Sequence, residues 1–375
     1  RLCRIKKIHD FEQATGINYD ASIGGSTDHN LDYVRSTARA YFDRVHDHDL
    51  GGQRLYVAEI GVASVVRATT FLDEYKRICE VAGTDSYRNT VYVLADYSQE
   101  ILERGRAQLA KTHPHVEAVR IDAADPTSAF ERYTGRIMHI HLCNVYDNLP
   151  TDKVAWLSER LFLMQSRAYV AGDVPTVLMA KYGLDPTDVE PFRARLQSLD
   201  GGSPRVGALL DWIRDRMVAA GQPPEHYVHL WMDLFAAMAF EERYVAMDAD
   251  AYARGLGIPE HAHIAESLTE LFRGRGDVRV HVNQHALAGF VKLLDVLHDH
   301  GSLEVVDLFV QRIDEYEHRH KGPAKYDGST VNWLNGPLFR AVAERMGFEV
   351  RFNSFKPFDP KSASVTMLAS RGTPA

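Results

Sequence analysis

The sequence predicts a doubly wound α/β fold, and three observations support this class. Short, continuous apolar segments alternate with helical segments between residues 51 and 150, and again after residue 281. These segments do not show the strict apolar–polar alternation of half-exposed strands. Continuous apolar runs of this kind are typical of strands that are buried on both faces of a parallel sheet. The chain has 375 residues, too many for one small core, so an insertion or a second lobe is expected.

The first predicted element is a helical N-terminal segment, residues 1–50. A glycine-bearing loop interrupts it at residues 15–25, and a helix begins near Asp28. Side chains at helical spacing then follow, namely Leu31, Val34, Ala38 and Tyr41. This periodicity predicts that the segment is mainly helical.

Four buried strands are predicted next, with helices between them. Each is a short apolar run; the first ends in glycine and the others end near a polar side chain. The predicted strands are 55–61, 91–96, 116–122 and 137–144. Helices are expected at 64–82 and 98–110, the second with Ser98 as its N-cap. This order predicts a parallel sheet with right-handed crossovers.

Residues 151–280 break the alternation and are predicted to form a helical insertion between the fourth and fifth strands. Glycine and proline punctuate the segment, and a stretch rich in aromatic residues and methionine runs from 226 to 246. We interpret that stretch as core of the insertion rather than as a substrate cage. The insertion is expected to serve as a substrate cap or as a dimerisation lobe.

The α/β pattern then returns and completes the sheet. It consists of a helix at 284–299, a strand at 303–309, a helix at 335–346 that ends at Gly347, and strands at 348–352 and 364–369. The prediction is therefore a mostly parallel, Rossmann-like sheet domain. It comprises residues 51–150 and 281–375 and is split by the insertion.

Composition disfavours several classes of protein. The formal net charge is −8, which argues against a nucleic-acid partner and is compatible with a small cationic substrate. No apolar run approaches the length of a membrane span, and the N-terminus lacks the apolar region of a signal peptide. Three cysteines are too few for a disulfide framework. We expect a cytoplasmic protein with no membrane partner, and a homodimer is compatible with the insertion.

Glycine and polar residues stand where the predicted strands end, which is the edge at which open parallel sheets bind ligands. Glu59-Ile60-Gly61 ends the first strand, where glycine lets a ligand approach and the next helix presents its N–H groups. Asp96 ends the second strand, where a carboxylate can accept both hydroxyl hydrogens of a ribose. The predicted cofactor-binding residues are Tyr19, Glu59, Gly61, Ala63, Asp96, Tyr97, Asp122, Ala123 and Asn144.

Each of these signals has a purely structural alternative. Gly61 could serve a tight turn, and Asp96 could be an ordinary capping or loop acid. Tyr19 and Asp20 could lie in a plain surface loop instead of folding over the cofactor. The ordered set at four successive strand ends is what favours a nucleotide-type cofactor.

This order resembles class I S-adenosylmethionine-dependent methyltransferases, which carry E-x-G after the first strand, D after the second and D-A after the third. Glu59 to Gly61, Asp96 and Asp122-Ala123 carry the resemblance here, and it implies S-adenosyl-L-methionine as cofactor. Ala63 departs from it, because the common loop has a second glycine there. The G-x-G-x-x-G fingerprint is absent, which counts against a nicotinamide-dependent oxidoreductase.

A narrower resemblance is to the MidA-like family, whose mitochondrial members methylate arginine on a respiratory-complex subunit. Glu59-Ile60-Gly61 is similar to its E-I-G-x-G, and residues 144–150 are similar to its N-E-x-x-D-A-L-P with the glutamate position altered. Residues 280–309 and Val331-Asn332 also fit. The resemblance covers mostly the sheet domain. It implies methylation of a guanidino nitrogen, in free L-arginine or an arginine-like substrate.

Carboxylates are the candidate groups for orienting such an acceptor, because a guanidinium is permanently charged and binds a carboxylate through two parallel hydrogen bonds. Asp147 lies in the loop after the fourth strand, and an acidic cluster follows the fifth. The predicted catalytic residues are Asp147, Asp314, Glu315, Glu317 and His318, the last as a general base. A solvated helix face is the alternative for the cluster, and also for Glu241-Glu242.

Further alternatives stay open. The chain could be an O- or N-methyltransferase of natural-product metabolism, or a non-catalytic assembly factor built on a methyltransferase fold. No metal is expected, although the sequence contains 18 histidines. His139 and His141, two positions apart on a strand, are expected to point to the same face of the sheet.

Overall fold

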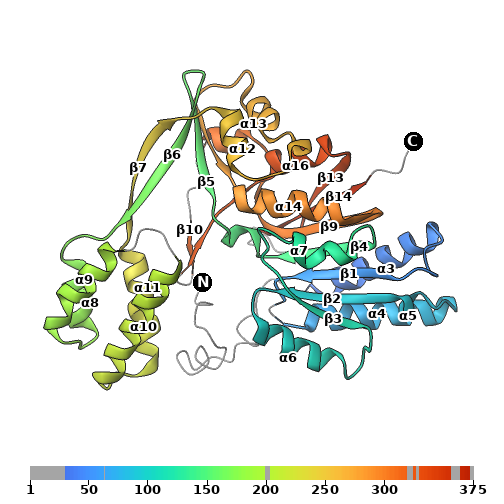
Figure 1. Cartoon of the computed structure of the whole chain (residues 1–375), viewed down its shortest axis with the longest axis horizontal. Coiled ribbons are helices and arrows are strands. Elements are labelled where there is room, and N and C mark those ends of the chain that lie inside the picture. The colour runs from blue at the N-terminus through green and yellow to red at the C-terminus, as the bar shows by residue number, and fades with distance from the viewer. Residues whose placement is uncertain are drawn as a thin grey trace. The chain divides into compact units, whose positions relative to one another are not determined.

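The computed structural model describes residues 30–62, 64–198, 203–318, 324–326, 329–355 and 364–371. These residues fall into two compact units (Figure 1). The larger unit contains the described chain up to Met164, from Tyr244 to residue 318, and from Asn332 onward. The smaller unit contains residues 165–243 together with the short strands β10 (Ala324–Tyr326) and β11 (Ser329–Val331).

A mixed, mostly parallel sheet forms the centre of the larger unit. Its strand order is β13-β14-β9-β4-β1-β2-β3, and β12 also pairs with β9. The neighbours β3, β2, β1, β4 and β9 run parallel, whereas β14 is antiparallel to β9 and to β13. The strands are β1 (Leu55–Ile60), β2 (Thr90–Asp96), β3 (Val116–Arg120), β4 (Ile137–Cys143), β9 (Leu297–Val310), β12 (Leu334–Asn335), β13 (Phe348–Ser354) and β14 (Ser364–Arg371). This sheet confirms the predicted fold class.

Helices cover both faces of this sheet. They are α3 (Leu31–Asp47), α4 (Val66–Ala82), α5 (Ser86–Asn89), α6 (Gln99–Leu109), α7 (Thr127–Phe130), α14 (Gln284–Val296), α15 (Asp314–His318) and α16 (Gly336–Arg345), with short 3-10 turns at Glu131–Tyr133 and Tyr146–Asn148. Ser98 caps α6 as predicted, because its hydroxyl accepts a hydrogen bond from the Ile101 N–H. The predicted N-terminal helix is present as α3, and residues 1–29 lie outside the described residues.

One face of the sheet packs on α14 and α16 and is apolar. Val93, Ile140, Leu142 and Val305 lie in one buried cluster with Phe290 and Phe339 of these helices. The opposite face lies beneath α3 and α4 and contains polar side chains: Glu59, His141 and Glu304 occupy matching positions on β1, β4 and β9. Since matched residues of paired strands point to the same side, these three groups share that face.

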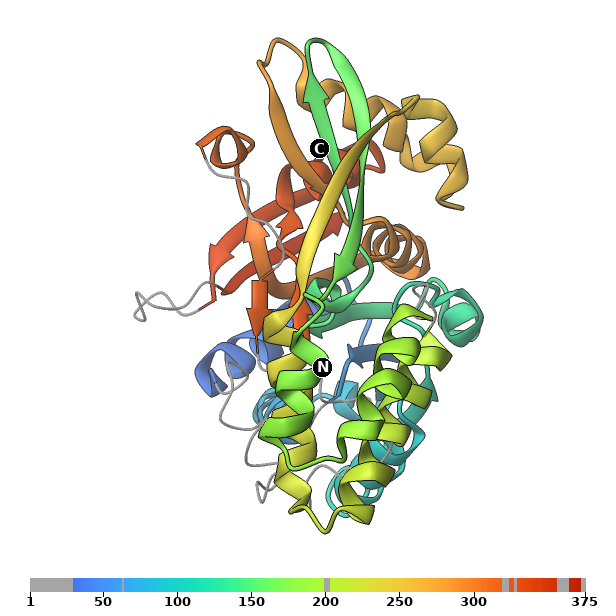
Figure 2. The same cartoon turned by 90° about the vertical axis from the view of Figure 1, so that its left-hand side faces the viewer.

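The segment 151–280 contains the predicted helices, and it also contains a sheet that the sequence did not predict. Strands β5 (Asp152–Leu157), β6 (Arg160–Tyr169), β7 (Ala239–Ala246) and β8 (Val278–Val282) form a second sheet in the order β7-β6-β5-β8. Figure 2 shows the green β6 and the yellow β7 running side by side as a long ribbon. All eight residues of β7 are exposed, so no alternation of apolar and polar residues indicated a strand there.

The helices of the insertion are α8 (Val174–Lys181), α9 (Val189–Gln197), α10 (Ser203–Ala219), α11 (Pro224–Ala237), α12 (Ala249–Gly255) and α13 (Ile264–Phe272), with 3-10 turns at Pro186–Asp188 and Glu260–Ala262. Helices α8 to α11 pack around Met179, Phe192, Ile213 and Leu230. The aromatic stretch at 226–246 divides at Met238 between α11 and β7. Its helical half packs on this core, as interpreted, whereas Phe240 and Tyr244 are exposed on the strand.

Candidate functional site

Gly61 lies at the end of β1, and its conformation requires glycine. Its φ is +82°, a region that L side chains rarely adopt, and its N–H donates to the Ala95 carbonyl across 2.8 Å. A Cβ at this position would lie 2.5 Å from Cγ2 of Val145, in the loop after β4. The tight turn and a close approach of chain segments are therefore both present at this strand end.

Helix α4 begins shortly after Gly61 at the same edge. Within the described residues, no side chain caps it at Val65, and its first turn contains no acidic residue. The first N–H groups of a helix have no partner inside the helix and carry a partial positive charge, which favours an anion or a carboxylate. Ala63, predicted to contact the cofactor, lies outside the described residues, as does Tyr19.

Asp96 stands at the end of β2, beside Gly61 in the adjoining strand. Its side chain is buried, and Oδ1 accepts a hydrogen bond of 2.8 Å from the Ser98 N–H, so it shapes the turn into α6. Tyr97 is 60% exposed, and its carbonyl accepts a hydrogen bond from Arg120. Asp96 therefore has the structural role of a loop acid, whereas Ser98 is the residue that caps the helix. A carboxylate positioned by its own turn is also well suited to bind a hydroxyl group.

Asp122 and Ala123 follow β3, which ends at Arg120. Asp122 is exposed, and its Oδ1 accepts a hydrogen bond of 2.9 Å from the Ala124 N–H. The Ala123 carbonyl lies against Gly289 of α14 so closely that a Cβ there would be 1.9 Å from the oxygen. Gly289 therefore allows this loop to pack directly on α14, a role that no sequence motif indicated.

The loop after β4 is held by a fully buried carboxylate. Asp307 of β9 accepts hydrogen bonds from the backbone N–H groups of Tyr146 (3.1 Å) and Asp147 (3.2 Å). Asn144 has a φ of +50°, and its carbonyl accepts from the Asn148 side chain, which also donates to Asp147. Asp147 is itself buried. Asp307 thus places Asp147 at the edge where β1 and β2 also end.

The acidic cluster after β9 lies at the predicted edge, on α15, and this chain's own groups occupy it. Asp314 accepts from Nε of Arg312 at 3.1 Å, and Glu315 accepts from the Arg312 N–H at 3.1 Å, which holds the turn before the helix. Arg275 pairs with Glu317 at 2.7 Å. His318 is the last residue of α15, and its side chain is outside the described part.

A buried ionic cluster lies on the polar face, below this edge, centred on Glu304. His141 lies 2.6 Å from its Oε2, Arg67 of α4 donates to the same oxygen at 3.1 Å, and Tyr33 of α3 donates to Oε1. Burial alone would raise the pKa of Glu304, but the hydrogen bond from His141 and the charges of His141 and Arg67 outweigh it. They hold that pKa well below its usual range.

Two neighbours extend this cluster. His139 bonds to Ser302 at 3.0 Å, and burial lowers the pKa of His139 to about 3, so the imidazole is neutral at ordinary pH. Tyr92 donates to Glu59 at 2.7 Å, so Glu59 belongs to the same polar face. His139 and His141 share a face as predicted, and both serve the cluster. Within the described residues, no group of three or more His, Cys, Asp or Glu side chains is arranged to hold a metal.

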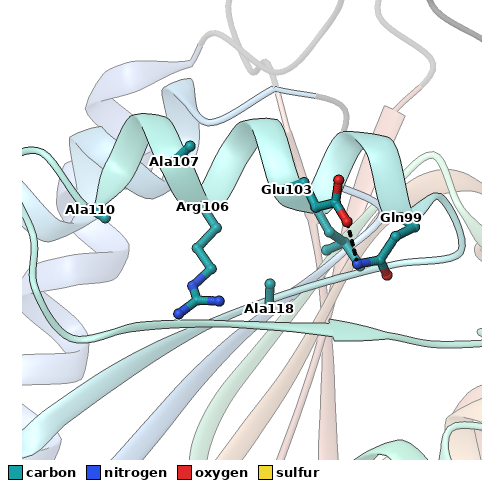
Figure 3. Close-up of a pocket in the computed structure, with 7 residues that line it drawn as sticks. Gln99, Glu103, Arg106, Ala107, Ala110 and Ala118 are labelled. Carbon is teal, nitrogen blue, oxygen red and sulfur yellow. Dashed lines mark hydrogen bonds between the residues drawn. The ribbon is translucent and has the colours of Figure 1, made fainter.

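A surface pocket of about 350 Å³ lies elsewhere, between α6 and β3. Figure 3 shows that its residues come from one face of α6 and from Ala118 of β3. The lining residues are Gln99, Leu102, Glu103, Arg106, Ala107, Ala110 and Ala118. None of them is a predicted site residue.

Among the described helices, none has the length and apolar character needed to cross a membrane.

Comparisons with solved structures identify the fold. No protein-family model matches the chain, and no curated protein matches its sequence. A Burkholderia thailandensis protein assigned as a methyl transferase, in complex with S-adenosyl-homocysteine, superposes with a TM-score of 0.50 at 13% identity, over 92% of this chain and 78% of that one. A second structure from that organism gives 0.47 at 14% identity, over 98% and 87%. The DszA carbon methyltransferase gives 0.41 at 10%, over 92% and 54%. The first likeness shows that this chain has a methyltransferase-type, Rossmann-like α/β fold.

Proposed function

We propose that the chain is an S-adenosylmethionine-dependent methyltransferase that binds its cofactor at the carboxyl edge of the central sheet. One observation carries the proposal: Gly61, Asp96 and the start of α4 stand together at the ends of two adjacent strands. The S-adenosyl-homocysteine in the Burkholderia thailandensis structure supports the choice of cofactor.

The residues present fit the parts of this cofactor. The α4 N-terminus suits its carboxylate, Asp96 suits its ribose hydroxyls, and the Asp122-Ala123 loop suits the edge of its adenine. The cofactor supplies an electrophilic methyl group on a sulfonium. The protein orients the acceptor in line with that methyl group and excludes water, which are the main contributions that such a displacement needs.

A guanidino or amino nitrogen is the acceptor that we propose first. Asp147 is the best-placed carboxylate, because Asp307 fixes it beside the ends of β1 and β4. Asp314 and Glu317 already contact Arg312 and Arg275, so an incoming guanidinium would have to displace a cation there. With the cofactor bound, its methyl group would be transferred to the acceptor nitrogen that Asp147 orients, and that nitrogen would release one proton to water.

Isothermal calorimetry tests the cofactor site. The full chain should bind S-adenosylmethionine and not NADH. Asp96→Ala should weaken binding by about tenfold or more, the loss of one or two charge-assisted hydrogen bonds. Asp85→Ala removes an exposed carboxylate, and its binding should match the wild type. No binding of S-adenosylmethionine, or equal binding by the Asp96 variant, would reject this site.

A transfer assay then tests the acceptor. Label from methyl-labelled S-adenosylmethionine should pass to L-arginine or to an arginine peptide. Asp147→Asn, which keeps the shape, should lower kcat while cofactor affinity is unchanged. Transfer only to hydroxyl or carboxyl acceptors would reject the nitrogen assignment and leave the cofactor site standing. Cofactor binding without transfer to any acceptor would favour the assembly-factor alternative.

A further inference from the structure

The segment 332–335 lies at the carboxyl edge of the central sheet, against the loop that contains Asp147. Its second half is β12, which runs parallel to β9 and pairs with the last two residues of that strand. Just before β12, the Asn332 N–H donates to the Asp147 carbonyl across 2.9 Å. Asp147 is thus held from two sides, by Asp307 through its N–H and by Asn332 through its carbonyl.

A fully buried amide, that of Asn283 at the end of β8, holds this segment in place. It donates to the Trp333 carbonyl at 3.2 Å and to Oγ1 of Thr151 at 3.1 Å. Its oxygen accepts from the Asn335 N–H at 2.9 Å. Thr151 directly precedes β5, at the end of the loop after β4. One side chain therefore connects that loop to the segment that enters β12.

Asn283 does not have the local role that its position suggests. It is the N-cap residue of α14, where an asparagine side chain ordinarily accepts a hydrogen bond from its own helix, yet its side chain does not cap α14. Asn335, the N-cap of α16, does have that role, because its Oδ1 accepts from the Leu338 N–H. The Asn283 amide instead bonds to two other segments with both donors and its oxygen, which fixes their relative position.

The side chain of Asn332 has hydrogen-bonding capacity that the described part of the chain does not use. It is partly buried, and no other described residue is hydrogen-bonded to its amide. Its backbone is bonded to that of Asp147, so a neutral amide and a carboxylate belong to neighbouring residues. A guanidinium offers several N–H donors, and an amide oxygen can accept one that the carboxylate leaves over.

We propose that Asn332 and Asp147 together recognise the nitrogen acceptor, and that Asn283 is the positioning residue that preserves their contact. This inference rests on the proposed function and adds a second residue to the acceptor site. Asp147 balances the charge of the acceptor, and the Asn332 amide oxygen accepts a further N–H. Since a hydroxyl group offers only one donor, such a pair favours acceptors with several N–H groups.

Binding and turnover of L-arginine by the full chain test the role of Asn332. Calorimetry measures L-arginine binding to the protein saturated with S-adenosyl-homocysteine, where no transfer occurs, and a labelled-methyl assay gives kcat and KM. Asn332→Ala should weaken L-arginine binding and raise its KM by about tenfold, the loss of one hydrogen bond to a charged group. Affinity for S-adenosyl-homocysteine should not change. Asn353→Ala, at an exposed position of β13, is the matched control and should bind both ligands like the wild type.

The role of Asn283 is tested against a variant that is destabilised elsewhere. Asn283→Ala should lower kcat/KM for L-arginine by about tenfold or more per folded molecule, because the acceptor site is displaced, with S-adenosyl-homocysteine affinity unchanged. Leu294→Ala loses stability in the apolar core and should keep kcat and KM. If Asn283→Ala does not fold, Thr151→Val removes one of the hydrogen bonds of Asn283 and should give a smaller loss of the same kind.

The outcomes separate this inference from the proposed function. A wild type that does not bind S-adenosyl-homocysteine would reject the proposed function and the acceptor pair with it. With cofactor binding intact, a wild type that binds no L-arginine, or an Asn332→Ala variant with wild-type L-arginine affinity, would overturn the role of Asn332 alone. Equal losses of kcat/KM in Asn283→Ala and Leu294→Ala, or none in either Asn283→Ala or Thr151→Val, would overturn the positioning role.

Discussion

The two faces of the central sheet, which are formed by alternate residues of the same strands, are stabilised in different ways. The face under α14 and α16 is filled by aliphatic and aromatic side chains such as Ile140 and Phe290. The face under α3 and α4 contains two buried carboxylates and two histidines, and an arginine of α4 packs on it. The first face supplies stability by burial, and its energy changes little with pH. The second face attaches α3 and α4 to the sheet through hydrogen bonds and an ion pair to the buried carboxylate of Glu304. Breaking one of these contacts costs much free energy, and the stability that they supply depends on pH.

The polar cluster also joins the segments that matter for the proposed site. Glu304 accepts hydrogen bonds from Arg67, in the first turn of α4, and from Tyr33 of α3. Since α4 begins at the proposed cofactor edge, the position of its N-terminus depends on this contact. Charged groups buried one layer below the proposed cofactor edge can therefore position that edge.

The largest effect is expected from Glu304→Ala. The change leaves Arg67 buried without its carboxylate, and removing one partner of a buried pair costs about 3–5 kcal/mol. Urea unfolding measures the free energy. Glu349→Ala, on the exposed side of β13, is the control and should change stability by less than about 0.5 kcal/mol. A loss below about 1 kcal/mol for Glu304→Ala would show that the cluster contributes little.

On the apolar face, Leu294→Ala should cost about 3 kcal/mol, through lost burial and a cavity. The measurement that distinguishes the faces is its pH dependence. The penalty should be equal at pH 5.5 and pH 7.5, because no ionisable group changes partner. A penalty that varies with pH would break the contrast between the two faces.

At the edge itself, Gly61→Ala should cost about 2 kcal/mol, because alanine at this positive φ is strained and its Cβ meets Val145. S-adenosylmethionine affinity should fall with it, because the turn into α4 must shift. Gly52→Ala is the control, since nothing lies near a Cβ there. Unchanged stability and unchanged affinity in Gly61→Ala would show that the turn tolerates a side chain.

The smallest effect concerns His139, whose pKa burial lowers from 6.5 to about 3. Below pH 6.5 the unfolded chain binds a proton that the folded chain excludes, so stability falls as the pH falls. The contribution is about 1 kcal/mol per pH unit in that range. His139→Asn should remove this part of the slope, whereas His261→Asn, at an exposed position, should leave it. Identical slopes for wild type and His139→Asn would contradict the assignment.

The central sheet was predictable because its strands are short apolar runs with glycine or acids at their ends. The caps at Ser98 and Gly347 followed from local rules as well. Strand β7 was missed because its residues are exposed on both sides, and an exposed ribbon has no periodic pattern.

The contacts that the site residues make were harder to predict from the sequence than the residues themselves. Glu304 was not predicted as a site residue, and its partners Tyr33 and Arg67 lie 271 and 237 residues away in the sequence. Arg275 pairs with Glu317 over 42 residues. No local pattern encodes such contacts, so the sequence predicted the acids of α15 without their cations. The roles of Tyr19 and Ala63 stay predictions, because both lie outside the described residues.

The most direct test of the proposed cofactor site is a crystal structure of the full chain with S-adenosyl-homocysteine. We expect the adenosine at the ends of β1 and β2, with its ribose hydroxyls hydrogen-bonded to Asp96, and the ligand's homocysteine carboxylate at the start of α4. A nucleoside bound away from this edge, for example in the pocket between α6 and β3, or one that makes no contact with Asp96, would contradict it.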